Sequence, residues 1–283
     1  MIKILHGSCT DRLKDLKDQS INTCITSPPY WGLRDYGEGE QLGLEDTPEE
    51  FVENLVQVFK EVKRVLRDDG TVWLNLGDSY LPNKQLGCIP FKVAIGLQAD
   101  GWYLRQDIIW HKPNPMPESI KDRCTKTHEY IFLLSKSPKY YYDNEAIKED
   151  CVGKDERKWS DTYDNVGSVI QGDTNADIKR TKRYSKDGSF KRNKRSVWTV
   201  TTKPFAEAHF ATFPMDLIEP CVLAGCPEGG TVLDPFGGSG TTALVANGHN
   251  RDAVLIELNE EYIEIAKKRL GFGTDLFNKI EIN

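Results

Sequence analysis

Two short polar segments, about two hundred residues apart, hold the residues whose types and spacing could do chemistry. The first reads Thr-Ser-Pro-Pro-Tyr-Trp at 26–31, and the second reads Asp-Pro-Phe-Gly-Gly-Ser-Gly-Thr at 234–241. Each follows a short apolar run that predicts a buried strand. A Gly-rich turn between a strand and a helix is where an α/β sheet receives a nucleotide-like cofactor. Together, the two segments suggest methyl transfer to a base.

The first segment predicts a rigid turn that holds two hydrogen-bond acceptors still. Pro28 restricts Ser27 to extended geometry, and Pro29 fixes the path of the chain into Tyr30. The Ser27 hydroxyl and the Pro28 carbonyl could accept both protons of an exocyclic amine, while the Tyr30 ring stacks on the base. This chemistry relies on positioning and electrostatics and needs no nucleophile from the enzyme. A base in a duplex would first have to be flipped out of the stack.

The second segment predicts a cofactor site. Its glycines allow close backbone approach before a helix that is expected from Thr241, and Glu257 ends the next predicted strand. A carboxylate roughly 20 residues after the glycines is where such folds bind ribose hydroxyls. A triphosphate-binding loop is disfavoured because the turn has no lysine. A nicotinamide cofactor is not excluded by the glycines alone.

Charge is unevenly distributed along the chain. The net charge is −6, but residues 151–198 carry twelve Lys or Arg against seven Asp or Glu, a local balance of +5. A basic stretch with interspersed aromatic residues and little periodicity is typical of a segment that neutralises phosphates, although a solvated surface loop has the same composition. The predicted DNA-binding residues are Lys179, Arg180, Lys182, Arg183, Lys191, Arg192, Lys194 and Arg195.

Composition limits the remaining function classes. The seven cysteines are scattered without a Cys-x-x-Cys pair, so we interpret them as reduced thiols and expect no metal site. No apolar run reaches the roughly 18 to 20 residues of a membrane span, and the first residues predict a strand and not a secretory signal. We therefore expect a cytoplasmic protein that has no contact with a membrane.

Strands and helices are predicted to alternate along both ends of the chain. We expect strands at residues 2–5, 22–26, 71–76, 103–110, 129–135, 231–234 and 253–257, and helices at 11–16, from Thr47 to Asp69-Gly70, at 90–99, from Phe213, at 241–246 and at 260–270. This pattern predicts an α/β fold with a doubly wound, mostly parallel, seven-stranded sheet. Residues 1–142 would form the catalytic half and 198–283 the cofactor half of one domain, with 143–197 inserted between them.

The chain resembles the amino-methylating DNA methyltransferases that use S-adenosylmethionine, in the permuted arrangement whose catalytic motif precedes the cofactor motif. Further motifs follow in the family's order: Trp-Leu-Asn-Leu-Gly-Asp at 73–78, Thr-His-Glu-Tyr-Ile at 127–131, Ala-His-Phe-Ala-Thr-Phe-Pro at 208–214 and Ile-Glu-Leu-Asn at 256–259. The resemblance implies catalytic roles for Ser27, Pro28, Pro29 and Tyr30. It implies S-adenosylmethionine contacts for Ser8, Phe213, Asp234, Pro235, Phe236, Gly238, Ser239, Gly240, Thr241 and Glu257.

The resemblance also bears on the target. A Ser-Pro-Pro-Tyr-Trp turn is associated in this family with the N4 amine of cytosine, and an Asp in the first position with the N6 amine of adenine. The inserted residues 143–197 look like a target-recognition region, which implies sequence-specific binding of double-stranded DNA and a partner restriction endonuclease. The alternatives are an adenine-N6 enzyme, an enzyme that acts on RNA, a DNA-binding relative without activity, and an oxidoreductase.

Three further residues are open to more than one interpretation. Ser8 stands where the family commonly has an aspartate near the cofactor adenine, so that it would supply a hydrogen bond without a charge. Asp78, at the end of a predicted strand, fits either a catalytic carboxylate or a cap of a turn. His128 fits a structural role better than a catalytic one.

Overall fold

The computed structural model describes residues 1–33, 35, 37–39, 41–150, 191–202, 213–271 and 280–282. The chain divides into two compact units, one of Met1–Ala146 with Arg195–Asn283 and the other of Ile147–Lys194. In the smaller unit, β6 (Glu149–Asp150) pairs antiparallel with β7 (Lys191–Arg192). The larger unit contains the central sheet.

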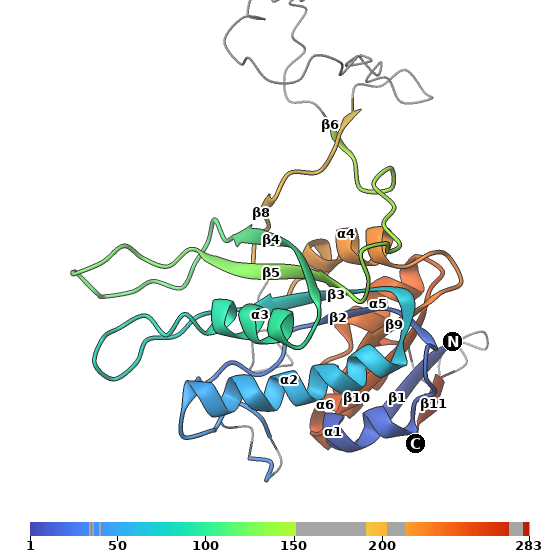
Figure 1. Cartoon of the computed structure of the whole chain (residues 1–283), viewed down its shortest axis with the longest axis horizontal. Coiled ribbons are helices and arrows are strands. Elements are labelled where there is room, and N and C mark those ends of the chain that lie inside the picture. The colour runs from blue at the N-terminus through green and yellow to red at the C-terminus, as the bar shows by residue number, and fades with distance from the viewer. Residues whose placement is uncertain are drawn as a thin grey trace, which may run out of the picture. The chain divides into compact units, whose positions relative to one another are not determined.

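Nine described strands form this sheet (Figure 1). Their spatial order is β11 (Ile280–Ile282), β1 (Ile2–His6), β10 (Asp252–Glu257), β9 (Thr231–Asp234), β2 (Ile21–Thr26), β3 (Leu66–Leu76), β5 (His128–Ser135), β4 (Tyr103–His111) and β8 (Val197–Thr199). β5 is antiparallel to both of its neighbours, and the other pairs are parallel. The mostly parallel α/β sheet is confirmed. The count of seven strands was wrong because the edge strands β8 and β11 are too short to show a hydrophobic period.

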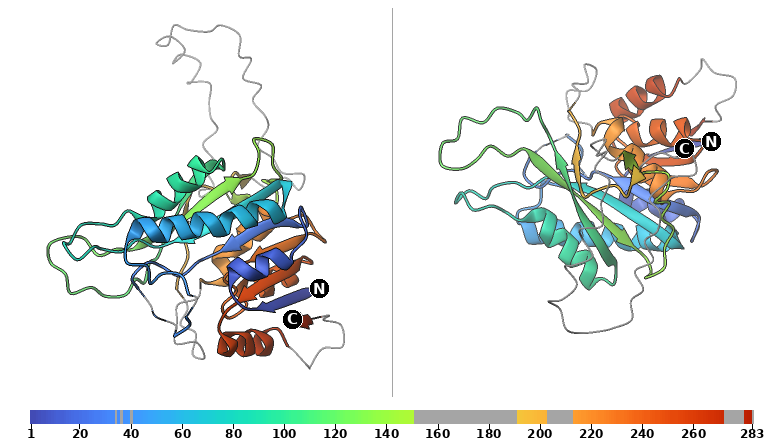
Figure 2. Two further views of the ribbon diagram at one scale, coloured as in Figure 1. Left: turned by 60° about the horizontal axis from the view of Figure 1, so that its bottom comes forward. Right: turned by 90° about the horizontal axis from the view of Figure 1, so that it is seen from above.

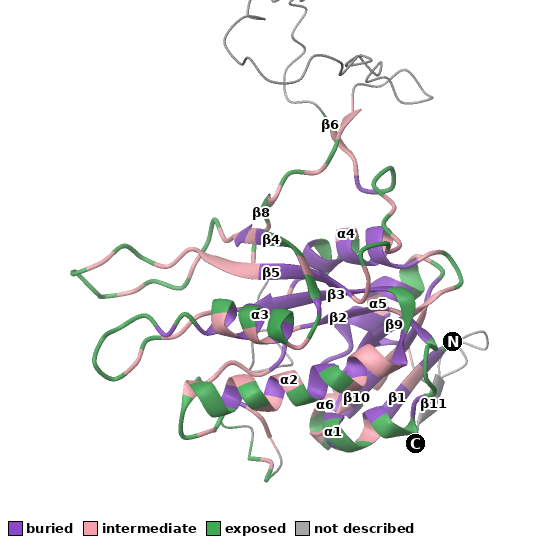
Figure 3. Cartoon of the chain, in the orientation of Figure 1, coloured by how far each residue is buried: buried purple, intermediate pink, exposed green. Residues whose placement is uncertain are grey.

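Helices cover both faces of the sheet (Figure 2). On one face lie α1 (Cys9–Arg12), α2 (Pro48–Val65) and α3 (Ile89–Ala99), which share one buried apolar cluster with the strands. On the other face lie α4 (Met215–Gly225), α5 (Thr241–Gly248) and α6 (Glu260–Arg269). The central strands are therefore buried on both sides, as Figure 3 shows.

Helix α2 begins as its sequence predicts and ends earlier. The Thr47 hydroxyl accepts a hydrogen bond from the Glu50 backbone N–H at 3.2 Å, and Pro48 occupies the first helical turn. The predicted end at Asp69-Gly70 was wrong. Leu66 is already extended and pairs with Ile21 of β2, so β3 starts there. Strand pairing thus overrides helical propensity over the last residues of the apolar pattern.

The chain order brings the two predicted motifs to one edge of the sheet. Strands β1, β10, β9 and β2 are parallel neighbours, so they end on the same side. Their last residues are His6, Glu257, Asp234 and Thr26. Ligands of open α/β sheets bind beyond the carboxyl ends of the strands. A ligand site is therefore expected at this edge of the sheet.

None of the described helices combines the length and the hydrophobicity that a bilayer span requires. Among all described residues, no three His, Cys, Asp or Glu side chains are grouped so that they could hold a metal ion. The six described cysteines are free thiols, of which Cys88 and Cys124 are exposed.

Candidate active site

Asp234, the last residue of β9, links the two motifs. Its carboxylate accepts hydrogen bonds from the hydroxyls of Thr26 and Thr242, both at 2.6 Å, and from the backbone N–H of Phe236 at 3.1 Å. Burial raises the pKa of Asp234 to about 7, while the three donors act in the opposite direction because they favour the charged form. The side chain thus fixes the start of the Gly-rich turn and ties it to the end of β2.

Glu257, the last residue of β10, is held by the Gly-rich turn. Its Oε2 accepts a hydrogen bond from the Gly238 backbone N–H at 2.7 Å, and its Oε1 accepts one from Asn259 N–H at 2.9 Å. Burial raises the pKa of the Glu257 carboxyl group. Gly238 has φ of 49°, and a Cβ built there would meet no atom nearer than 3.9 Å. The carboxylate and the open turn beside it fit the ribose of a nucleoside cofactor.

Gly237 and Gly240 serve a different purpose from Gly238, because they permit close packing of the turn. A Cβ at Gly237 would lie 2.9 Å from the side chain of Leu255 on β10. A Cβ at Gly240, where φ is 81°, would lie 3.0 Å from the side chain of Ala266 on α6. These two glycines allow the turn to sit directly against its neighbouring strand and helix.

Arg269, the last residue of α6, also holds this turn. Its guanidinium donates to the backbone carbonyl of Ser239 at 2.7 Å and to the hydroxyl of Thr241 at 3.1 Å. The buried Ser239 hydroxyl also accepts a hydrogen bond from Arg269. Sequence reasoning did not identify Arg269. The predicted contact of Ser239 and Thr241 with a cofactor stays a prediction.

Ser8 lies after β1, at the same edge of the sheet, and is 8% exposed. Its hydroxyl lies 2.9 Å from that of Thr10 and donates to the Asp11 carboxylate at 3.3 Å. A hydrogen bond from Lys14 lowers the pKa of Asp11. An ionised carboxylate therefore lies next to Ser8, although the residue itself is neutral.

For the other predicted cofactor residues, the structure gives only the burial or the position along the chain. Pro235 is buried, and Phe236 packs against the apolar core beneath the first three helices. Phe213 lies just before α4. Residues 203–212, which include His209, lie outside the described residues. The cofactor roles of these side chains stay predictions.

The four predicted catalytic residues follow β2 as one turn. Pro28 is buried, and Ser27, Pro29 and Tyr30 are partly exposed. The Ser27 hydroxyl donates to the Tyr30 hydroxyl at 3.3 Å, and the Tyr30 hydroxyl donates to Glu129 Oε2 at 2.7 Å. The turn thus begins beside Asp234, and Glu257 lies one strand further along the same edge of the sheet.

Three residues beside this turn were given no role in the sequence analysis, although Asn75 and Glu129 lie within two of the motifs that it names. Asn75, near the end of β3, directs its amide nitrogen at Glu129 Oε2 (3.0 Å), and Lys112 forms an ion pair with Glu129 Oε1. Asn75 is 4% exposed, and its side-chain oxygen has no hydrogen-bond partner in the described part of the chain. The signal that could have found Asn75 is a polar residue inside an otherwise apolar strand.

Gly77 permits the position of the Tyr30 ring. A Cβ at Gly77 would lie 2.5 Å from the Tyr30 ring carbon Cε2, closer than van der Waals contact allows. Gly77 follows the last residue of β3. The ring therefore lies directly on the backbone at this strand end, and a side chain at this position would displace it.

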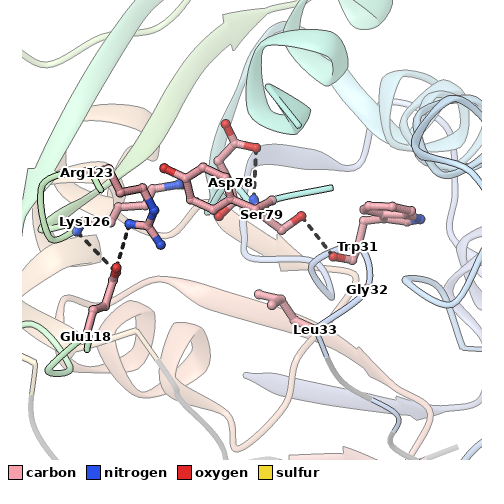
Figure 4. A pocket seen from close by; sticks show the side chains of 9 residues that line it. Trp31, Gly32, Leu33, Asp78, Ser79, Glu118, Arg123 and Lys126 are labelled. Atoms are coloured by element: carbon pink, nitrogen blue, oxygen red, sulfur yellow. Dashed lines mark hydrogen bonds and ion pairs between the residues drawn. The ribbon is translucent and has the colours of Figure 1, made fainter. Parts of the chain in front are cut away.

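A cavity of about 240 Å³ borders the catalytic turn (Figure 4). Trp31 and Leu33 line one side, and Glu118, Arg123 and Lys126, from the β4–β5 connection, line the other. Arg123 and Glu118 form an ion pair at 2.6 Å. Burial lowers the pKa of Lys126. The cavity combines apolar and charged walls, which suits a polar aromatic ligand.

The hydrogen bonds of Asp78 favour the capping interpretation. Its Oδ1 accepts from the backbone N–H groups of Ser79 and Ile89, both at 3.0 Å, and Ile89 begins α3. His128 Nε2 lies 3.1 Å from the Tyr130 hydroxyl, and burial lowers the pKa of His128. Both residues thus have structural partners within the fold.

The predicted DNA-binding residues are only partly described. Lys179, Arg180, Lys182 and Arg183 lie outside the described residues. Of the other four (Lys191, Arg192, Lys194 and Arg195), Arg192 forms an ion pair with Glu149 at 2.9 Å, between β7 and β6. Their contact with DNA stays a prediction.

Comparison with known proteins gives consistent matches. The family model N6_N4_Mtase, described as DNA methylase, matches residues 21–268. The type II methyltransferase M.Cfr9I of Citrobacter freundii is 44% identical over 94% of this chain and 87% of its own length. M.SmaI of Serratia marcescens is 43% identical over 95% of this chain and 90% of its own length.

Solved structures share the fold. The PvuII DNA methyltransferase, described as cytosine-N4-specific, has a TM-score of 0.70 and 21% identity, and the match covers 98% of this chain and 87% of that one. TTHA0409 of Thermus thermophilus, complexed with S-adenosylmethionine, has a TM-score of 0.66 and 23% identity over the full length of both chains. The methyltransferase-type sheet predicted from the sequence is confirmed, and these matches agree with the predicted cofactor.

Proposed function

Because this chain belongs to the DNA methylase family that carries methyl groups to exocyclic amines, we propose that it methylates the N4 amine of cytosine in double-stranded DNA. S-adenosylmethionine is the methyl donor. The observation that carries the proposal is the catalytic turn of Ser27 to Tyr30, one strand away from the carboxylate Asp234 that fixes the cofactor turn. The amine acceptors and the cofactor site therefore share one edge of the sheet.

The cofactor half of the site supports this assignment. S-adenosylmethionine supplies an electrophilic methyl group on a sulfonium. Glu257, held by two backbone N–H groups, would bind the ribose hydroxyls, and Gly238 leaves room for the neighbouring part of the cofactor. The pair of Ser8 and Asp11 at the end of β1 would face the adenine amine. Each of these groups lies at the end of a neighbouring parallel strand.

The catalytic turn would act on the target amine without forming a covalent bond to it. The Ser27 Oγ and the Pro28 carbonyl would accept the two amine protons, which weakens the conjugation of the nitrogen with the ring and turns its lone pair toward the methyl group. The Tyr30 ring would stack on the base, at a position that Gly77 makes available. Positioning of this kind lowers the activation free energy of enzyme reactions by several kcal/mol, as an order of magnitude.

The target base must leave the duplex to reach this turn. Unstacking costs a few kcal/mol, and stacking on Tyr30 would return part of it. The cavity beside Trp31 offers space next to the turn for the extruded nucleotide. We assign target recognition to residues 143–197, whose basic residues would neutralise phosphates. A restriction endonuclease with the same recognition sequence would be its functional partner, since its relatives are type II methyltransferases.

The choice of cytosine rests on the residue at position 27. A serine offers one neutral oxygen to the amine, and the Ser-Pro-Pro-Tyr-Trp form resembles the turn of cytosine-N4 enzymes. The test is incubation of the protein with unmethylated DNA of varied sequence and S-adenosylmethionine, followed by digestion to nucleosides and mass spectrometry. N4-methylcytosine supports the proposal. N6-methyladenine would overturn the choice of base, and no methylated nucleoside with cofactor binding verified would overturn the DNA-methylating activity.

A further inference from the structure

A directed chain of hydrogen bonds leads from the catalytic serine into the protein. It runs from the Ser27 hydroxyl to the Tyr30 hydroxyl (3.3 Å) and from there to Oε2 of Glu129 (2.7 Å). Glu129 lies in β5, and its side chain is 15% exposed. A hydroxyl has one proton to donate, so the direction of each link decides the direction of the next.

The carboxylate at the end of the chain determines that direction. An ionised carboxylate accepts hydrogen bonds and donates none. Tyr30 must therefore give its proton to Glu129, and the Tyr30 oxygen is left to accept the proton of Ser27. Because its proton is donated to Tyr30, the Ser27 oxygen can offer only lone pairs to any other group, and so acts as an acceptor. This is the state in which it could receive a proton of the target amine.

Two neighbours reinforce this arrangement. The Lys112 ammonium pairs with the other carboxylate oxygen of Glu129 and lies 4.2 Å from the centre of the Trp110 ring, so that a positive charge is held beside the carboxylate. The Asn75 amide nitrogen lies 2.8 Å from the Tyr30 hydroxyl and 3.3 Å from the Ser27 hydroxyl. Because this nitrogen only donates, neither hydroxyl can direct its proton toward Asn75, and Glu129 Oε2 is the carboxylate acceptor that is left for Tyr30.

We propose that Glu129 is a positioning residue, which acts through Tyr30 to keep Ser27 in its proton-accepting orientation toward the target amine. The inference rests on the proposed function, because it presumes an amine at Ser27. It holds for the N4 amine of cytosine and for the N6 amine of adenine alike. Glu129 need not touch the base or the cofactor in this role. Glu129 therefore affects the rate of methyl transfer and not the affinity for DNA or for the cofactor.

Glu129→Gln is the variant that tests the direction of the chain. The substituted amide keeps the shape of the side chain but can donate to the Tyr30 oxygen, so Tyr30 could donate to Ser27 and Ser27 would turn its proton toward the amine. We expect kcat to fall by at least about tenfold, the order of magnitude for a misaligned reacting group. We expect KM for DNA and the calorimetric Kd for S-adenosylmethionine to change less than about twofold, since neither ligand is held by Glu129.

A double-variant cycle separates this role from a general structural one. Once Ser27→Ala has removed the acceptor, adding Glu129→Gln should cost nothing further, because both changes disable the same oxygen. The control is Glu61→Gln on α2, a partly buried carboxylate that is ion-paired with Arg64 outside the site. It should retain the kcat of the unmodified protein. Initial rates with saturating S-adenosylmethionine on unmethylated DNA provide all of these values.

The outcomes distinguish the inference from the proposed function. The inference is wrong if Glu129→Gln retains full kcat. It is also wrong if adding Glu129→Gln to Ser27→Ala lowers kcat further. Both results leave the proposed function intact, provided that the unmodified protein methylates DNA. A loss that appears instead in KM or in cofactor affinity also overturns it. If the unmodified protein produces no methylated nucleoside, the proposed function fails, and the inference fails with it.

Discussion

The hydroxyl of Thr26 donates a 2.6 Å hydrogen bond to the carboxylate of Asp234, across 208 positions of the sequence. One residue after Thr26 the catalytic turn begins, and three residues after Asp234 the chain reaches the first glycine of the Gly-rich turn. This bond therefore joins the two halves of the candidate site at their starting points. Both partners are buried, so the distance between the halves is set within the core and not at the surface.

The raised pKa of Asp234 predicts how stability depends on pH. Its pKa is about 7 in the folded protein, above the ordinary value of 3.8, so the folded state holds a proton that the unfolded state releases between these values. Its contribution to stability is complete below about pH 4 and is lost as the pH rises through 7. At about 1.4 kcal/mol for each pKa unit, the loss amounts to a few kcal/mol.

The variant that checks this is Asp234→Asn, which cannot titrate. In urea denaturation at several pH values, the stability of the unmodified protein should fall relative to the variant between pH 4 and 7. Parallel curves would show that Asp234 does not titrate in this range. The comparison removes the effect of other carboxylates, because they are common to both proteins.

Tyr30→Ala should separate base stacking from cofactor binding. The loss of one aromatic stacking surface should cost roughly 1 to 3 kcal/mol in productive DNA binding. The Kd for S-adenosylmethionine, measured by calorimetry, should stay nearly unchanged, since the cofactor residues lie on other strands. Tyr30→Phe serves as the matched variant, because it keeps the ring and removes the hydroxyl. A large loss of cofactor affinity in Tyr30→Ala would contradict the division of roles.

Gly77→Ala should impair the same step through packing alone. The added methyl group would lie 2.5 Å from the Tyr30 ring, so the ring must move. We expect a fall in methylation rate with little change in cofactor affinity. Gly39→Ala is the control, since a Cβ there meets nothing within 4 Å. Equal rates for Gly77→Ala and the unmodified protein would mean that the position of Tyr30 is not critical.

Neutralisation of the basic residues 191–195 should flatten the salt dependence of DNA binding. Each lost phosphate contact should reduce the slope of log affinity against log salt by about 0.9. Arg192 already pairs with Glu149, so Lys191→Gln should have a larger effect than Arg192→Gln. Lys17→Gln, on an exposed turn before β2, is the control. An unchanged slope after neutralisation of Lys191, Arg192, Lys194 and Arg195 would place phosphate binding elsewhere.

The sequence predicted those parts of the site that lie directly after a buried strand. Ser27 and Tyr30 follow β2, and Asp234 and Glu257 end β9 and β10, so a parallel sheet brings them to one edge without knowledge of the register. Turn chemistry and the expectation of a mostly parallel sheet were sufficient for this step.

Residues that depend on strand register were missed. Glu129 approaches Asn75 because β5 runs antiparallel to β3 and pairs Asn75 with Ile131. Nothing in a single sequence fixes that register. Arg269 was missed for a related reason, since its partner Ser239 lies on a different element 30 residues away. The short edge strands β8 and β11 were also not predicted.

The position of β9 between β2 and β10 has a consequence for synthesis of the chain. Strand β2 pairs with β9, which leaves the ribosome about two hundred residues later. The centre of the sheet thus forms only when two strands that are far apart in the sequence pair. Such pairing is slow, because the chain loses the entropy of loop closure before the contacts between the strands contribute any stabilising free energy. A nascent or truncated chain without β9 would expose an open edge at β2. The candidate site is therefore incomplete until β9 and the Gly-rich turn that follows it have been made.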